Sequence, residues 1–261
     1  MMWWMTSLAL AKEISFDPVL DGSLTIISLG AYYVLKDTSP RAIKSVAKPY
    51  GLDAVGTPRW NGAAIPISDF LGHPLKLYGM NAPVLSTIAL GVGMGVQNGY
   101  QQGLAHGAVV MEAVALNGVI TQSLKLWISR PRPFTSTAFQ QQYPDIYNGA
   151  YIREELAKKD AWLSMPSGHT STAAATYTSI ATLLAFHDPK NRNWYYGGAA
   201  TLTLAAGSTR VIAGMHHPTD VLVGALVGAG IGYGVAVLHT ATESSSATDT
   251  APNVFVFQGQ W

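Results

Sequence analysis

The chain alternates between uncharged apolar runs and short polar segments. The apolar runs cover residues 22–35, 77–111, 170–186, 194–208 and 221–238, and the second continues past Glu112 to residue 125. The Asn98–Gly99 pair and the glutamines that follow it divide this second run, because Asn and Gly are common where helices break. Each piece is long enough for a helix. The pattern therefore predicts an all-α fold, a bundle of about six apolar helices.

Length and charge both bear on whether these helices cross a membrane. Several runs are shorter than the roughly 20 residues of a bilayer crossing, and the mean hydropathy of +0.18 is low. Charged residues make up only 12% of the chain, about half the fraction usual in soluble proteins. Gly224, Gly228 and Gly232 recur every four residues, a spacing that lets membrane helices approach closely. We expect a membrane-embedded bundle, with a soluble helical domain as the alternative.

The order of the runs predicts which helix ends share a side of the membrane. If every run spans, the run ending at residue 125 and those beginning near 170 and 221 open on one face. The turn that holds Lys190 and Arg192 lies on the other face, and its positive charge fits the cytoplasmic side. This topology predicts that the helix ends near residues 125, 170 and 221 lie on the non-cytoplasmic face. The expected location is a bacterial inner membrane, where this face is the periplasmic one.

The two ends of the chain differ from its middle. Residues 1–11 finish in an Ala-x-Ala pattern that resembles a secretory signal, although no Lys or Arg precedes it; an interfacial aromatic start is the alternative. Residues 240–252 are rich in Ser, Thr and Ala and are expected to be disordered. We predict an N-terminal segment at 1–21, one helical domain at 22–239 and a disordered tail at 240–261.

Composition excludes several classes of function. The net charge is +1 and no basic run is interleaved with aromatic residues, so nothing supports nucleic acid binding. The chain has no cysteine, which excludes disulfides and thiolate metal sites.

Two clusters of polar residues lie at the ends of predicted helices. The first runs from Lys125 to Arg132, directly after an apolar helix, and gathers positive charge. The second, Pro166–His169, directly precedes the next helix. Hydroxyl and backbone N–H groups at such a helix start point outward and bind anions. Both clusters therefore favour a negatively charged ligand.

A third cluster contains Arg210, His216 and Asp220 before the last apolar run. Pro218 suits the first turn of a helix, which would place Asp220 within hydrogen-bonding reach of the His216 imidazole. A carboxylate holds a histidine in one tautomer. Such a histidine can act as a nucleophile, a general base or a metal ligand, and spacing alone does not choose among them. A simple helix cap is the plain alternative.

Together the clusters supply three cations, backbone donors and two histidines, the groups needed to hold a tetrahedral dianion and transfer it. The pattern K-x6-R-P, P-S-G-H and S-R-x5-H-x3-D resembles the signature of the type 2 phosphatidic acid phosphatase (PAP2) superfamily, which includes bacterial class A acid phosphatases and vanadium haloperoxidases. The resemblance covers about residues 77–240. Thr209 stands where that family usually has Ser; a hydroxyl is retained, so we expect little effect.

The resemblance implies a metal-independent phosphatase, without a cofactor, that hydrolyses a lipid phosphate or diphosphate monoester. It implies that His216 attacks phosphorus to form a phosphohistidine and that Asp220 orients its ring. It also implies that His169 protonates the leaving oxygen and later activates water. The residues implied to hold the substrate phosphate are Lys125, Arg132, Arg210, Ser167 and Gly168.

Other interpretations stay open. The chain could be a soluble periplasmic acid phosphatase of broad range, a vanadium haloperoxidase, or a non-catalytic membrane protein that binds a phosphorylated ligand. A metal hydrolase built from His216, His217 and Asp220 would lose activity in EDTA. Arg130 is interpreted as a supporting or surface cation. His106 and Glu112 are expected to pair with polar neighbours in the bundle, although an ionisable group at membrane depth can mark a functional path.

Overall fold

The computed structural model describes residues 13–38, 61–73 and 81–245, with side chains up to residue 240, and this part of the chain is helical without strands. Six long helices confirm the predicted bundle. They are α1 (Leu20–Asp37), α4 (Ala82–Asn98), α5 (Tyr100–Ile128), α9 (Gly168–His187), α10 (Arg192–Ile212) and α11 (Pro218–Ser245). A shorter helix, α3 (Ala64–Gly72), lies between α1 and α4 in the chain.

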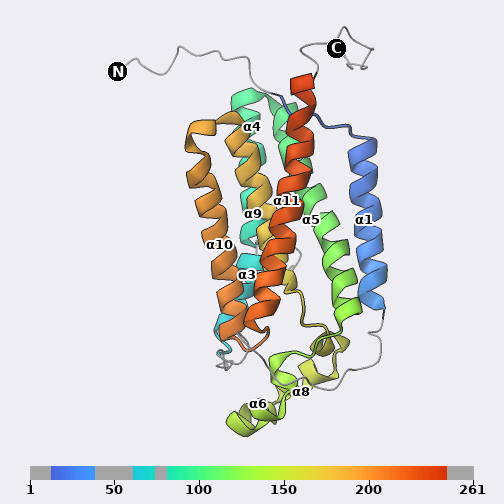
Figure 1. The fold of residues 1–261 in the computed structure, drawn as a ribbon, viewed down its shortest axis with the longest axis vertical. Helices are drawn as coiled ribbons and strands as arrows, with labels where there is room; N and C mark the ends of the chain where they lie inside the picture. Colours follow the sequence, from blue (N-terminus) through green and yellow to red (C-terminus); the bar gives the residue numbers. More distant parts are fainter. Residues whose placement is uncertain (1–12, 39–60, 74–80, 246–261) are drawn as a thin grey trace.

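The segment between α5 and α9 forms a small cap of short helices at one end of the bundle. Its elements are η1 (Pro133–Thr135), α6 (Thr137–Gln142), α7 (Pro144–Tyr147), α8 (Ala150–Ala157) and η2 (Lys159–Trp162), and η3 (Pro189–Asn191) lies in the turn after α9. Figure 1 shows α6 and α8 at the lower end of the molecule, below the long helices. This agrees with the polar segment that the sequence predicts between the apolar runs.

Helix α9 lies at the centre of the bundle. It packs against α11, α10, α5 and α3. Many of the buried side chains of α9 itself are small, among them Ser171, Ala173, Ala174 and Ala175. These small residues let neighbouring helices approach closely along this part of α9, while large side chains such as Tyr177 and Leu183 lie further along it. The composition of α9 thus explains why it takes the central position.

The contact between α9 and α11 depends on the glycines of α11. A Cβ atom at Gly224, Gly228 or Gly232 would come within 3.0 Å of a backbone carbonyl oxygen of Ser167, Ser171 or Ala175, respectively. No side chain fits in that space, so only glycine allows the two backbones to meet. The four-residue glycine spacing in the sequence is therefore a helix-packing device, as predicted.

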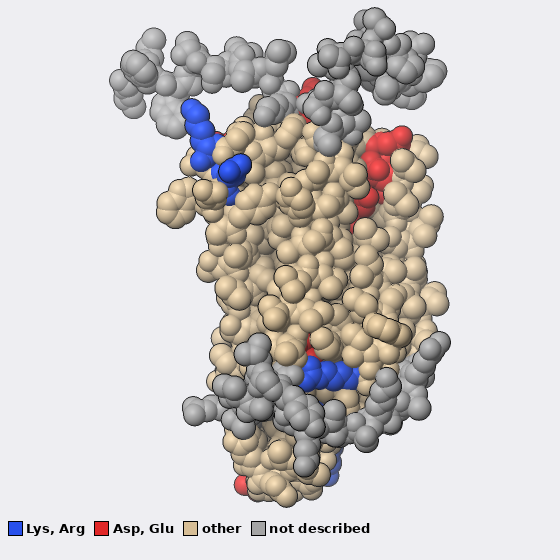
Figure 2. Space-filling view, viewed as in Figure 1, with Lys and Arg blue, Asp and Glu red and all other residues tan. Residues whose placement is uncertain are grey.

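The outer surface is that of a membrane protein. Large apolar side chains are exposed on the outer helices, for example Ile26, Val92, Leu204 and Leu226. Figure 2 shows a broad band without Lys, Arg, Asp or Glu across the middle of one face, with charged residues towards the two ends. Two segments, Tyr100–Gln142 and Pro218–Thr240, are long and apolar enough to cross a bilayer. Contiguous apolar surface of this extent marks a membrane interface.

Several boundaries differ from the predicted ones. The break between α4 and α5 is a single residue, Gly99, whose φ of +92° suits glycine. Helix α11 continues to Ser245, so the tail expected to be disordered from residue 240 starts inside a helix; residues 246–261 lie outside the described part. The first twelve residues, with the signal-like pattern, also lie outside it.

Candidate active site

The three polar clusters of the sequence meet at the end of the bundle beside α6 and α8. Lys125 is on the last turn of α5, Pro166–His169 precedes and begins α9, and Arg210 is on the last turn of α10. All of these elements end at the lower side of Figure 1. Lys125, Arg132, Gly168, His169 and Arg210 line one cavity of about 740 Å³. The structure thus brings together residues that are up to 95 positions apart.

The three predicted phosphate-binding cations are buried around this cavity. Lys125, Arg132 and Arg210 are 7%, 5% and 5% exposed. Buried cations need anions close by, because each loses its hydration. Asp160 supplies one: its carboxylate forms an ion pair with the Arg132 guanidinium and lies 3.5 Å from the Lys125 ammonium. The sequence analysis missed this residue, which lies in the polar segment 133–165.

Asp160 is the carboxylate that pairs with two of the three cations. Its side chain is 50% exposed, so it can leave the cations without opening the bundle. Burial by itself would raise the pKa of Asp160, but Arg132 and Lys125 outweigh that effect and hold the pKa well below its ordinary range. The carboxylate is therefore ionised over the whole physiological range.

His216 lies in the turn between α10 and α11, with its Nδ1 facing Asp220. The distance from Nδ1 to Asp220 Oδ2 is 3.6 Å, longer than a hydrogen bond. Ser164 connects them: its hydroxyl donates to Asp220 Oδ2 at 2.5 Å and lies 3.4 Å from Nδ1. The predicted direct hydrogen bond is thus absent, and Ser164 is a second residue that the sequence analysis missed.

Asp220 is fully buried and holds several groups in place. One oxygen accepts a hydrogen bond from the backbone N–H of His217 at 2.8 Å. The other pairs with Arg130 Nη1 at 2.7 Å. Arg130 is thus the supporting cation that we expected, and its partner is the orienting carboxylate. His217 contributes its backbone to Asp220, while its side chain does not line the cavity.

His216 is a buried imidazole with one ring nitrogen that has no hydrogen-bond partner among the described residues. Burial, together with Arg132 and Arg210, keeps the pKa of His216 well below its ordinary value, so the imidazole is neutral. A proton on Nδ1, facing Ser164 and Asp220, leaves a lone pair on Nε2. Among the described residues, Nε2 is buried without a hydrogen-bond partner. It is therefore available to a ligand.

The second histidine, His169, has its own carboxylate. Its Nε2 lies 2.8 Å from Asp69 Oδ1 on α3, and Arg210 Nη1 lies 3.4 Å from the same oxygen. Burial and the nearby Arg210 lower the pKa of His169 well below its ordinary value, and the Asp69 carboxylate opposes this shift only in part. Asp69 was not predicted, because it lies in a polar stretch whose place in the fold the sequence does not reveal.

Ser167 and Gly168 form the start of α9. Ser167 is fully buried, and its hydroxyl caps the helix by accepting hydrogen bonds from the backbone and the hydroxyl of Thr170. Its backbone N–H donates to the Asp220 carbonyl. Gly168 lies beside Lys125, whose Nζ would be 3.8 Å from a Cβ at this position. Ser167 thus caps the helix without lining the cavity, whereas Gly168 lines it beside Lys125.

Sequence comparison agrees with this geometry. A model of the PAP2 superfamily matches residues 107–243, more than half of the chain. Lipid A 1-phosphatase of Rhizobium johnstonii is 31% identical over 123 residues, covering 47% of this chain and 43% of that protein. Phosphatidylglycerophosphatase B of Bacillus subtilis is 29% identical over 125 residues, covering 47% and 52%. The chain thus spans about half the length of the curated relatives that it matches.

A solved structure is similar over most of the chain. The crystal structure of a transmembrane PAP2 type phosphatidylglycerolphosphate phosphatase from Bacillus subtilis covers 88% of both chains, with a TM-score of 0.46 and 20% sequence identity. The family match is independent of that likeness, and its residues, 107–243, contain all three polar clusters. The chain therefore belongs to the PAP2 superfamily.

Proposed function

We propose that this protein is a membrane phosphatase that hydrolyses a lipid phosphate or diphosphate monoester through a phosphohistidine, without a metal ion. One observation carries the proposal. Three buried cations and His169 line a cavity, His216 is buried next to the lining residue Met215 without lining the cavity itself, and each histidine faces a carboxylate. A protein that only binds a phosphate group would need the cations alone. Two histidines with separate carboxylates suit the transfer of a phosphoryl group. The catalytic domain would comprise residues 22–239.

The reaction would proceed in two displacements at phosphorus. Lys125, Arg132 and Arg210 bind the non-bridging oxygens, and the Asp160 carboxylate moves away. The Nε2 lone pair of His216 forms a bond to phosphorus as the bond to the leaving oxygen breaks, and His169 donates a proton to that oxygen. Water then attacks phosphorus and gives a proton to His169. The P–N bond breaks, which releases phosphate and restores His216.

The shape of the cavity supports a lipid substrate. Besides the charged residues, it is lined by Leu29 and Tyr32 of α1 and by Val114 and Ala115 of α5. Val114 lies three helical turns before Lys125, about 16 Å along the axis. The cavity thus extends from the cations into the apolar part of the bundle. This extension suits an acyl or prenyl chain, and the names of the relatives, a lipid A 1-phosphatase and a phosphatidylglycerophosphatase, agree with it.

We place the site on the periplasmic face. The ends of α5, α9 and α11 that carry or adjoin the polar clusters lie on the same side of the bundle, while η3 with Lys190 lies at the other end. Positive turns favour the cytoplasmic side. An impermeant phosphate ester added to intact spheroplasts should be hydrolysed. Hydrolysis only after permeabilisation would contradict this orientation.

The activity is tested by phosphate release from a panel of lipid phosphates and from an aryl phosphate, in EDTA, by the full-length protein in detergent. We expect His216→Ala to lose at least about 10³-fold in turnover, as a nucleophile variant does. His217→Ala is the matched neighbour and should keep most of its activity. Equal losses in both variants, or loss of the native activity in EDTA, would instead favour the metal hydrolase built on His216, His217 and Asp220.

A further inference from the structure

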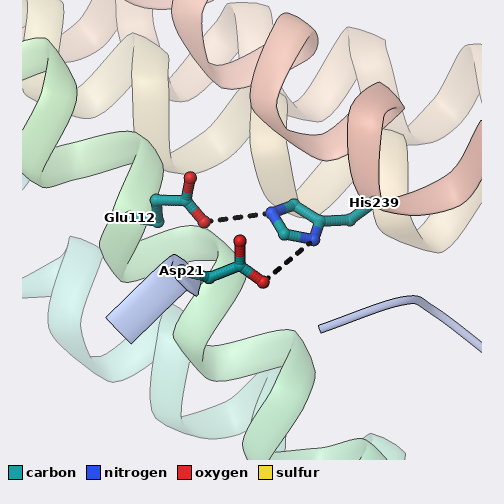
Figure 3. Close-up of side chains that lie close together, drawn as sticks. All are labelled: Asp21, Glu112 and His239. Carbon is teal, nitrogen blue, oxygen red and sulfur yellow. Dashed lines mark hydrogen bonds and ion pairs between the residues drawn. The ribbon is translucent and has the colours of Figure 1, made fainter. Parts of the chain in front are cut away.

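A second group of ionisable side chains is buried at the opposite end of the bundle. Figure 3 shows Asp21 of α1, Glu112 of α5 and His239 of α11 pointing toward one another. His239 Nε2 lies 3.0 Å from Glu112 Oε2, and Nδ1 lies 3.9 Å from Asp21 Oδ2. His239 is nineteen residues after Asp220 on α11, about 28 Å along the helix axis. The group is therefore distant from the three polar clusters, although Glu112 lies two residues before Val114, which lines the inner part of the cavity.

The hydrogen bonds of His239 determine where its ring proton lies. Nδ1 is 2.6 Å from the backbone carbonyl oxygen of Ser15. A carbonyl oxygen only accepts, so Nδ1 must carry a hydrogen. A neutral imidazole then has a lone pair on Nε2, and this lone pair faces the carboxylate of Glu112. Two acceptors at 3.0 Å repel each other unless a cation lies between them, either a proton or a metal ion.

The net charge of the group distinguishes between a proton and a metal ion at this position. Asp21 and Glu112 both have side chains less than 15% exposed, and among the described residues the ion pairs of both are with His239. If His239 is neutral, two buried negative charges are uncompensated. If His239 is protonated, one of the two negative charges remains uncompensated, and burying an unpaired ion is costly. A divalent metal ion would balance both.

We propose that Asp21, Glu112 and His239 bind a divalent transition-metal ion such as Zn²⁺ or Mn²⁺. Their ligand atoms all lie within 4.8 Å of one another, and metal bonds of about 2.0–2.2 Å place ligand atoms roughly 3–4 Å apart. One imidazole nitrogen and two carboxylates suit these ions better than Mg²⁺ or Ca²⁺, which prefer oxygen alone. Metal-binding histidines usually donate their other ring N–H to a carbonyl, as Nδ1 does to Ser15.

The ion would join three separate parts of the chain. Residues 13–17 cross this end of the bundle: the backbone N–H of Ser15 donates to the His239 carbonyl at 2.9 Å, and that of Asp17 donates to Asp21 Oδ2 at 2.6 Å. With Asp21 on α1 and Glu112 on α5, the ion ties the start of the described chain to α11. Its role would be to stabilise the fold, at a distance from the chemistry.

The test uses full-length protein in detergent, stripped with EDTA and titrated with Zn²⁺ or Mn²⁺, with Mg²⁺ and Ca²⁺ for comparison. We expect about one equivalent of Zn²⁺ or Mn²⁺ by elemental analysis and a higher unfolding temperature, because an ion that binds only the folded state stabilises it. His216→Ala should bind the same equivalent. If His216→Ala lost it, the metal would belong to the other end of the bundle and this proposal would be wrong.

Glu112→Gln is the most informative variant. A glutamine N–H can donate to the His239 Nε2 lone pair, so this nitrogen has a hydrogen-bond partner without a cation. We expect this variant to bind no metal and to unfold, in EDTA, at or above the temperature of the stripped native protein. His106→Asn is the matched control: it removes another buried histidine of α5, which contacts His187 at 2.8 Å, and should keep the metal effect.

Two results would overturn the proposal. If the native protein binds none of the four ions at millimolar concentration, and EDTA leaves its unfolding temperature unchanged, His239 is a protonated ion-pair partner. If His106→Asn abolishes metal binding while Glu112→Gln keeps it, the metal lies between His106 and His187. Neither result bears on phosphate release, which is measured separately in EDTA.

Discussion

The two ends of the bundle carry opposite imbalances of charge. At the end capped by α6 and α8, Lys125, Arg132 and Arg210 surround a cavity. The partly exposed Asp160 offsets only part of their charge. At the other end, two carboxylates share one imidazole in a closed, buried group. The first end lacks an anion and is open to one, while the second lacks a cation and is closed.

This difference in charge indicates a chemical role for the first end and a structural role for the second. An open cavity with excess positive charge can exchange its anion, and the partly exposed carboxylate of Asp160 pairs with Lys125 and Arg132. A closed group with excess negative charge does not need to exchange a bound ion with solvent. Because it is buried, it can link the helices strongly. The glycine-lined contact between α9 and α11 holds the two ends at a fixed separation.

Removing a cation from the open end should have the largest effect. We expect Arg210→Gln to lower kcat/KM by about 10²- to 10³-fold, as the loss of one group that stabilises transition-state charge does. His106→Asn, at the closed end, should change it by less than about threefold. Both are measured on the same lipid phosphate with protein of checked folding. Comparable losses in the two variants would show that the ends are not functionally distinct.

The carboxylate that faces His169 should have the next largest effect. Asp69→Asn keeps the shape but stabilises a protonated His169 less, so we expect kcat on an alkyl or lipid phosphate to fall by about 10²-fold with KM little changed. An aryl phosphate with a good leaving group needs little protonation, and its kcat should fall much less. An equal fall for both substrates would mean that Asp69 only supports the fold.

The sequence identified the residues that we propose to act on phosphorus better than those that position them. Lys125, Arg132, His169, Arg210 and His216 were found because each stands at a fixed spacing beside the end of an apolar run. The long helices were found for the same reason, since a run without charges identifies a helix whatever its neighbours are.

The residues that were missed are brought to their places by tertiary packing. Asp69 reaches His169 from α3, 100 positions earlier, and Asp160 reaches Arg132 from η2, 28 positions later. No local spacing relates such residues. Glu112 was noticed as a buried charge, but its partner His239, 127 positions away, is a single histidine at the end of an apolar helix and gives no signal of its own.

The apolar extension of the cavity should control the choice between lipid and soluble substrates. We expect Val114→Phe, which fills the cavity beside α1, to lower lipid phosphate turnover by about tenfold while aryl phosphate turnover stays nearly constant. Leu116→Phe, on the exposed side of the same helix, is the control and should affect neither. A parallel fall for both substrates in Val114→Phe would mean that the lipid chain lies elsewhere.

Asp160→Asn should have the smallest effect on turnover and the most specific effect on binding. The variant removes an anion that competes with phosphate for Lys125 and Arg132, so inorganic phosphate should inhibit about tenfold more strongly, the effect of one nearby charge under moderate screening. Because the folded-state pKa of Asp160 is lowered, its carboxylate stabilises the fold above its unfolded pKa near 4, and this stabilisation is lost only as the pH falls below that value. Asp160→Asn should therefore unfold at a lower temperature than the native protein at pH 7, by a difference that narrows below about pH 4 and that saturating phosphate at pH 7 removes. Unchanged inhibition by phosphate would mean that Asp160 does not occupy the place of a substrate oxygen.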